Sequence, residues 1–157
     1  MIYHSLREFI GQLEINNELI RITDQVSPIL EISEITDRIS KQDQGGKALL
    51  FENVEGSNIP VLINAFGSTK RINLALGVQN IEKIPTDIDK YLKIVPPSSL
   101  LEKIKLLPML LEAAAFPPKI VSSNQALCQE IIYSGDDVDL EKLPILQCWP
   151  SDAGRFI

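Results

Sequence analysis

The chain has 157 residues, of which 45% are hydrophobic and 23% charged, and its formal net charge is −6. These values are typical of a soluble globular protein with one or two small domains, and they argue against intrinsic disorder. Its Lys and Arg residues are scattered rather than clustered, so we expect no nucleic-acid partner.

Targeting and redox signals are also sparse. No apolar run approaches the ~20 residues of a membrane-spanning helix, because the longest, 106–116, is broken by a proline and a glutamate. Residues 1–4 lack the basic and apolar regions of a signal peptide. Two cysteines, Cys128 and Cys148, are too few for a disulfide framework. We therefore expect a cytoplasmic protein with reduced thiols and no membrane span.

The first helix is predicted to begin after Ser5. Ser5 and Glu8 form a capping box, in which the hydroxyl accepts from the N–H of residue 8 and the carboxylate reaches back to the N–H of residue 5. An Asn-Asn pair ends the helix, and residues 19–23 then alternate like a half-buried strand. The apolar stripe of the helix comprises Leu6, Phe9, Ile10 and Leu13.

A second helix is predicted from Ser27, because Ser is a favoured N-cap and Pro28 suits the first helical position. Gly45-Gly46 closes this segment. Residues 48–52 and 59–64 are short apolar runs around a polar turn, which predicts neighbouring strands, with a hairpin as one arrangement. One face of the helix is lined by three isoleucines: Ile32, Ile35 and Ile39.

Two further helices are expected next. Ser68 can cap a helix that runs through Leu76, and Gly77 suits the position just past its end. Residues 81–92 form the other helix.

The second half of the chain begins with a break at Pro96-Pro97. The segment 99–102 is a capping box that opens a helix towards residue 115, which Pro108 should kink. Residues 126–133 are predicted as a strand. The final stretch, 136–157, reads as a strand entry, a turn rich in Asp and Gly, and the start of another strand, so the chain looks cut within a growing sheet.

These elements predict an α/β (α+β) protein. Residues 1–95 form a small mixed-sheet domain with flanking helices, 96–117 a helical connector, and 118–157 the opening strands of a second domain.

Few residues have the pattern of a catalytic or metal site. The only histidine, His4, is interpreted as a surface residue, since it lacks the partners of a triad or a His-based metal site. Cys128 and Cys148 lack CxxC spacing and are interpreted as buried structural thiols. The acidic residues of the second helix are interpreted as an exposed acidic face rather than paired catalytic carboxylates: Glu31, Glu34 and Asp37.

Three loops have alternative interpretations. Gly45-Gly46 lacks a phosphate-loop pattern, whereas Gly67–Lys70 could bind an anion at a helix start, although a capped N-terminus explains the same residues. The segment Trp149–Gly154 either shapes a pocket or anchors a turn onto a core. An acidic cluster is interpreted as a solvated turn rather than a cation site: Asp136, Asp137, Asp139 and Glu141.

Several segments together resemble the UbiD-type decarboxylases. GGKALLFENVEGSNIPVLINAFGSTKRINLALG (45–77) is similar to the family's N-terminal domain, as are SLREFIGQLEINNELIRI and EISEITDRI. VDLEKLPILQCWPSDAGRFI (138–157) resembles the start of the family's central flavin-binding domain, a split β-barrel. The resemblance covers nearly the whole chain and is weakest over 80–118.

The resemblance implies a reversible decarboxylase of aromatic or α,β-unsaturated acids. Among such enzymes, the sequence is most similar in character to 3-polyprenyl-4-hydroxybenzoate decarboxylase of ubiquinone biosynthesis. Such enzymes use prenylated FMN with a divalent metal, commonly Mn2+, and K+, and they form homo-oligomers. The cofactor carries the chemistry. The family's catalytic, flavin and metal residues lie beyond this chain, so none is assigned here. We expect the chain alone to bind none of these cofactors and to be inactive.

The barrel strands expected in 118–157 lack their later partners. We therefore expect this stretch to be disordered, swapped or paired across a dimer, with unpaired backbone groups along 127–133 and 143–157, while 1–95 folds alone. Two other functions stay open from the residues themselves. One is a non-catalytic assembly module of a larger enzyme, and the other is a small-molecule binding protein that uses the helix start at Ser68.

Overall fold

The structure is a computed structural model that describes residues 3–93, 104, 106–108, 110–111, 114, 117–118, 120–122 and 125–155. The chain divides into two units. One combines residues up to 84 with those from 139 onward, and the other spans 85–138. Among the described helices, none has the length and apolar character that crossing a bilayer requires.

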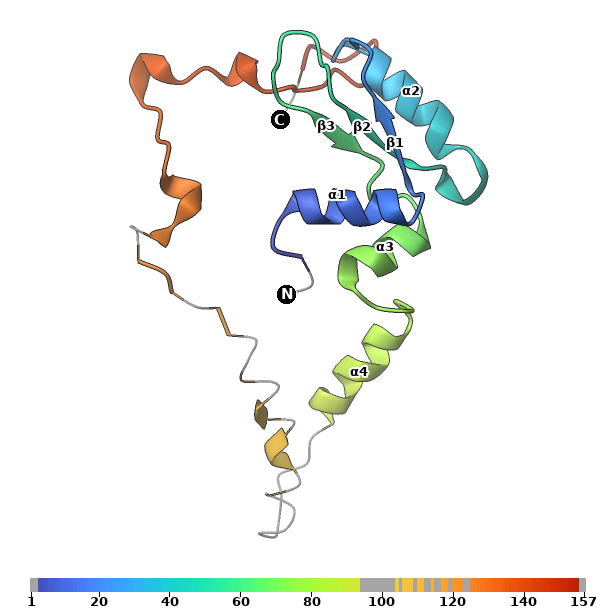
Figure 1. Cartoon of the computed structure of the whole chain (residues 1–157), viewed down its shortest axis with the longest axis vertical. Coiled ribbons are helices and arrows are strands. Elements are labelled where there is room, and N and C mark those ends of the chain that lie inside the picture. The colour runs from blue at the N-terminus through green and yellow to red at the C-terminus, as the bar shows by residue number, and fades with distance from the viewer. Residues whose placement is uncertain are drawn as a thin grey trace. The chain divides into compact units, whose positions relative to one another are not determined.

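A three-stranded mixed sheet forms the centre of the first unit (Figure 1). Its strands are β1 (Leu19–Ile22), β2 (Ala48–Phe51) and β3 (Val61–Ile63). β2 lies in the middle, parallel to β1 and antiparallel to β3, with Leu50 opposite both Arg21 and Leu62. The predicted mixed sheet is thus confirmed, and 48–52 and 59–64 do form a hairpin.

All four residues of β2 are buried because helices cover both faces of the sheet. Ala48 and Leu50 pack against α1 (Leu6–Ile15), and residues of α3 (Thr69–Leu76) lie against the same cluster. Leu49 and Phe51 point the other way and pack against α2 (Glu31–Ser40). The two faces follow from the period of two along a strand.

The predicted serine caps of α1 and α3 are present, and each serine hydroxyl accepts from a backbone N–H three residues later. The Ser5 hydroxyl accepts from the backbone N–H of Glu8 at 3.3 Å, and the Ser68 hydroxyl accepts from that of Arg71 at 3.2 Å. The reciprocal bond of the first box differs from the prediction, since the Glu8 carboxylate accepts from the N–H of His4, one residue earlier. Gly77 follows α3 in the left-handed conformation, as predicted.

The helix predicted from Ser27 begins later, at Glu31. Its inward face is as predicted, because Ile32 is fully buried and Ile35 and Ile39 pack beside it. The helix does not begin at Ser27 because Ile29 and Leu30 pair with Gln147 instead. The later helix predicted over 81–92 is present as α4 (Lys83–Leu92).

The strand predicted over residues 126–133 is wrong. This stretch contains one 3-10 turn, η3 (Leu127–Gln129), followed by η4 (Gly135–Asp137), and its large apolar side chains are exposed. A strand needs a neighbour to pair with, and the described residues provide none here. The capping box at 99–102 lies outside the described residues.

The last described residues belong to the first unit and pack against its N-terminal part. After η5 (Leu140–Lys142), Gln147 forms a parallel bridge with Ile29, and Leu146 packs against the cluster around Phe51. The Ser57 hydroxyl also donates to the Lys142 carbonyl at 2.8 Å. The expectation of disorder, swapping or pairing across a dimer is therefore wrong for residues 142–147, which find partners within the same chain.

Candidate functional site

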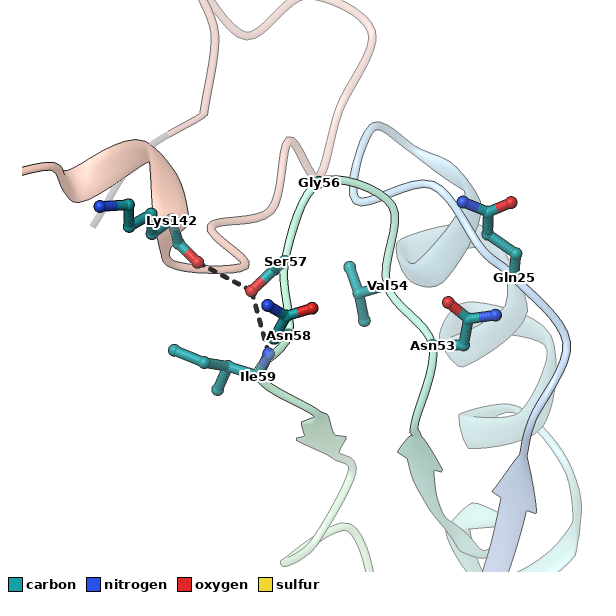
Figure 2. A pocket seen from close by; sticks show the side chains of 8 residues that line it. All are labelled: Gln25, Asn53, Val54, Gly56, Ser57, Asn58, Ile59 and Lys142. Atoms are coloured by element: carbon teal, nitrogen blue, oxygen red, sulfur yellow. Dashed lines mark hydrogen bonds between the residues drawn. The ribbon is translucent and has the colours of Figure 1, made fainter.

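A polar hollow of about 530 Å³ lies beside the loop that joins β2 to β3 (Figure 2). The Gln25 and Asn53 amides come from neighbouring segments, and Asn58 lies across from them with Val54 between. The hydrogen bond from Ser57 to the Lys142 carbonyl closes one side. These side chains can hydrogen-bond a polar group, but they include no candidate nucleophile with a neighbouring base.

A second hollow, of about 630 Å³, lies between α2 and the loop that begins at Cys148. The loop is a compact turn, because the Asp152 carboxylate accepts from the Trp149 N–H at 2.9 Å and the Asp152 N–H donates back to the Trp149 carbonyl. The Trp149 side chain is 67% exposed and lines the hollow. Of the two interpretations of Trp149–Gly154, pocket shaping fits this position, since a Trp that anchors a turn would be buried.

The interpretation of both cysteines as buried thiols is wrong, because Cys128 and Cys148 are exposed. Cys128 lies in η3 rather than in a packed strand, and Cys148 lies at the rim of the second hollow. His4 is exposed, as predicted.

The helix start at Gly67–Lys70 borders a small hollow, but the Lys70 ammonium already has partners within the protein. The Lys70 ammonium lies 2.7 Å from a Glu18 carboxylate oxygen and also donates to the Asn16 carbonyl at 3.2 Å. The Ser68 hydroxyl caps the helix. A capped N-terminus therefore accounts for these residues better than an anion site does.

Arg71 is a buried residue that the sequence interpretation missed. Its side chain is fully buried, and one Nη atom donates to Glu18 at 3.0 Å and to the Gly46 carbonyl at 2.5 Å. The other Nη donates to the Gly45 carbonyl at 3.3 Å. A signal was present, since Arg71 falls at helical spacing from Leu74 and Ala75, both of which pack against the core.

Glu18 joins the two cations. Burial raises the pKa of its carboxyl, but the hydrogen bonds from Lys70 and Arg71 outweigh that effect and hold the pKa below its ordinary value. The carboxylate therefore stays ionised and compensates the buried guanidinium. This network ties together the start of β1, the Gly45-Gly46 turn and α3, which is a structural role rather than a catalytic one.

The acidic clusters are solvated, as predicted. On α2, Glu34 pairs with Arg38 and Asp37 with Lys41, both one helical turn apart at the surface. Asp139 accepts from the N–H of Glu141 at 3.0 Å. Within the described ranges, no group of three or more His, Cys, Asp or Glu residues lies close enough to hold a metal ion.

Comparison with known proteins identifies the family. Residues 10–90 match the N-terminal domain of 3-octaprenyl-4-hydroxybenzoate carboxy-lyase, UbiD_N, and residues 119–157 match the UbiD Rift-related domain of the same enzyme. The chain belongs to the UbiD family.

Solved UbiD structures share this fold. The UbiD-class enzyme HmfF from Pelotomaculum thermopropionicum, in an evolved dimeric form in complex with prFMN, is 28% identical, with a TM-score of 0.66 over 98% of this chain and 30% of that one. The apo 3,4-dihydroxybenzoic acid decarboxylase from Enterobacter cloacae is 25% identical, with a TM-score of 0.63 over 98% of this chain and 29% of that one. The Sedimentibacter hydroxybenzoicus vanillic acid decarboxylase, at 23% identity over 99% of this chain and 30% of that one, shows the fold alone, with a TM-score of 0.73.

This UbiD chain spans about a third of the length of the relatives that it matches. An uncharacterized protein of Aquifex aeolicus is 50% identical over 99% of this chain, which is 31% of that protein. One from Archaeoglobus fulgidus is 47% identical over the whole of this chain, again 31% of that protein. The described residues offer neither a metal cluster nor a catalytic triad.

Proposed function

We propose that this chain is the N-terminal part of a UbiD-class carboxy-lyase that decarboxylates an aromatic acid. The match of two UbiD domains in the expected order supports the proposal. We propose domain boundaries at 1–95, 96–117 and 118–157, with the last segment opening the split-barrel flavin-binding domain.

The proposed substrate is 3-polyprenyl-4-hydroxybenzoate, in ubiquinone biosynthesis. The description of the matching family, 3-octaprenyl-4-hydroxybenzoate carboxy-lyase, supports this choice. The longer protein is proposed to be a cytoplasmic homo-oligomer that uses prenylated FMN, Mn2+ and K+. HmfF, whose structure contains prFMN, supports the flavin. The 157-residue chain is proposed to be inactive alone, since its described residues form no catalytic constellation.

The test compares this chain with a longer polypeptide that carries the downstream UbiD domains. Both are titrated with prenylated FMN and Mn2+, and carbon dioxide release is measured with 3-polyprenyl-4-hydroxybenzoate and with 3,4-dihydroxybenzoate. We expect flavin binding and turnover only in the longer polypeptide, and a preference for the prenylated acid. Turnover by the 157-residue chain would contradict the proposed inactivity, and preference for the other acid would contradict the substrate.

A second candidate function is a non-catalytic assembly module. The contacts of residues 142–147 with Ile29 and Ser57 favour it, because the described part of the chain builds contacts there rather than a reaction centre. Size-exclusion chromatography of this chain mixed with the downstream domains separates the two functions. An association without decarboxylation, in a longer protein that also lacks activity, would favour the assembly role.

A further inference from the structure

Residues 27–30 contain a conflict between local sequence and structure. Ser27 and Pro28 are a strong helix start, yet α2 begins only at Glu31. Leu30 instead has φ 66° and ψ −34°, and the Glu31 N–H donates to the Ile29 carbonyl at 2.8 Å. This is a γ-turn with positive φ, which is rare and strained for a residue with a side chain. Some contact outside the segment must therefore maintain it.

Gln147 supplies that contact. Its N–H donates to the Pro28 carbonyl at 3.1 Å, and its carbonyl accepts from the Leu30 N–H at 2.9 Å. Leu146, the preceding residue, packs against the buried cluster that includes Ile32 and Phe51. These three interactions together form the Gln147 clasp.

A helical start would give the same backbone groups other partners. The Ser27 hydroxyl already accepts from the Ile29 N–H at 3.3 Å, and in a helix capped by Ser27 it can also accept from the Leu30 N–H. The Pro28 carbonyl would accept from the Ile32 N–H, which now lies 3.4 Å from the Ser27 carbonyl. The helical partners thus replace both hydrogen bonds that the clasp makes.

We propose that residues 27–30 are a two-state switch: they are held in the γ-turn while the Gln147 clasp is closed, and they join α2 as its first turn when the clasp opens. Closing the clasp buries Leu146 and satisfies two hydrogen bonds but strains Leu30. Opening it removes the strain and uses the Ser27-Pro28 start. Docking of the Rift-domain segment is therefore coupled to the length of α2.

The test opens the clasp in the 157-residue chain by two independent routes. Gln147→Pro removes the N–H that donates to Pro28, and Leu146→Ala removes the packed side chain. Leu140→Ala is the matched control, because Leu140 lies in the same segment and is 56% exposed. NMR backbone shifts and the amide–Hα coupling of Leu30 report the conformation of residues 27–30.

We expect both clasp variants to give helical shifts over residues 28–31 and a negative φ at Leu30, while Leu140→Ala keeps the wild-type values. A variant that retains positive φ at Leu30 after its Gln147 contacts are lost overturns the proposal. Fraying of 27–30 into random-coil shifts overturns it as well.

A second comparison keeps the clasp intact and changes only the strain. Leu30→Gly and Leu30→Ala remove the same side chain, but only Gly adopts positive φ freely. Exchange of the Gln147 amide, which is bonded to the Pro28 carbonyl only while the clasp is closed, should be slower in the Gly variant by about 5- to 30-fold, which is the preference expected for one left-handed position. Equal exchange in the two variants would show that Leu30 stores no strain.

Discussion

At the scale of single residues, Arg71 is the most consequential side chain described. It is fully buried, and its guanidinium bonds Glu18 and two glycine carbonyls, while its Nε has no partner. Taking away one member of a buried ion pair leaves the other uncompensated and typically destabilises a protein by about 3–5 kcal/mol.

Arg71→Ala should therefore lower the free energy of unfolding by about 3 kcal/mol or more, since it also empties the volume of the side chain. Urea denaturation followed by circular dichroism measures the change. Arg38→Ala is the control, because the exposed pair of Arg38 with Glu34 should contribute less than ~0.5 kcal/mol. Similar losses of unfolding free energy in both variants would show that the buried network stabilises the fold no more than an exposed ion pair does.

Glu18 should make stability depend on pH in acid. The pKa of its carboxyl is lowered in the folded chain, so the carboxylate stabilises the fold fully above the ordinary value of 4.5. This contribution is lost as the pH falls from there through the folded pKa. Denaturation curves between pH 6 and about pH 3 should show a smaller pH dependence in Glu18→Gln than in the wild type. An unchanged slope would remove Glu18 from the acid response.

At the scale of elements, three glycines distinguish the cost of a positive φ angle from the cost of a steric clash with an added Cβ. Gly46 has φ +58°, and a Cβ there would lie 2.0 Å from the Ile39 carbonyl oxygen. Gly56 has φ +76° but open space around it, and Gly11 lies within α1 with nothing near. Each position therefore tests a different combination of the two effects.

We expect Gly46→Ala to destabilise most, because the backbone clash adds to the left-handed penalty. Gly56→Ala should cost about 1–2 kcal/mol for conformation alone. Gly11→Ala should stabilise by about 0.5–1 kcal/mol, because Ala is the better helix former. Thermal melts followed by circular dichroism give the order, and a Gly46→Ala variant as stable as Gly56→Ala would contradict the clash.

The elements also show what sequence can predict. The caps at Ser5 and Ser68 and the short apolar run of β2 depend on neighbours within a few residues, so they were predictable. The start of α2 was not, because it is decided by Gln147, which is far away in sequence. The helical spacing of Arg71 indicates its burial, but its acceptors could not be predicted for the same reason, since they come from two other segments.

At the scale of the whole chain, the buried core of the first unit and the exposed residues 127–133 should differ in accessibility to protease. Leu127 and Tyr133 are exposed and lie outside any strand, whereas Phe9 and Phe51 are buried. Limited chymotrypsin digestion should therefore cut first near Leu127 or Tyr133. Mass spectrometry of the early fragments identifies the sites. Early cleavage at Phe9 or Phe51 would contradict the burial of the first unit.

The two-part family assignment was accessible from sequence because its motifs are local strings, at 45–77 and 138–157. The docking of residues 142–147 was not accessible. It depends on a hydroxyl in the β2–β3 loop and on two backbone groups before α2, and none of these has a sequence pattern that names its partner.

The chain has a single tryptophan, and it lies in the loop that follows the Gln147 clasp rather than in the core. Its intrinsic emission therefore reports the solvent exposure of that loop and changes little when the sheet itself unfolds. A fluorescence-based thermal scan of this protein would record the release of its C-terminal segment, and anyone who reads that midpoint as global unfolding would report the wrong temperature.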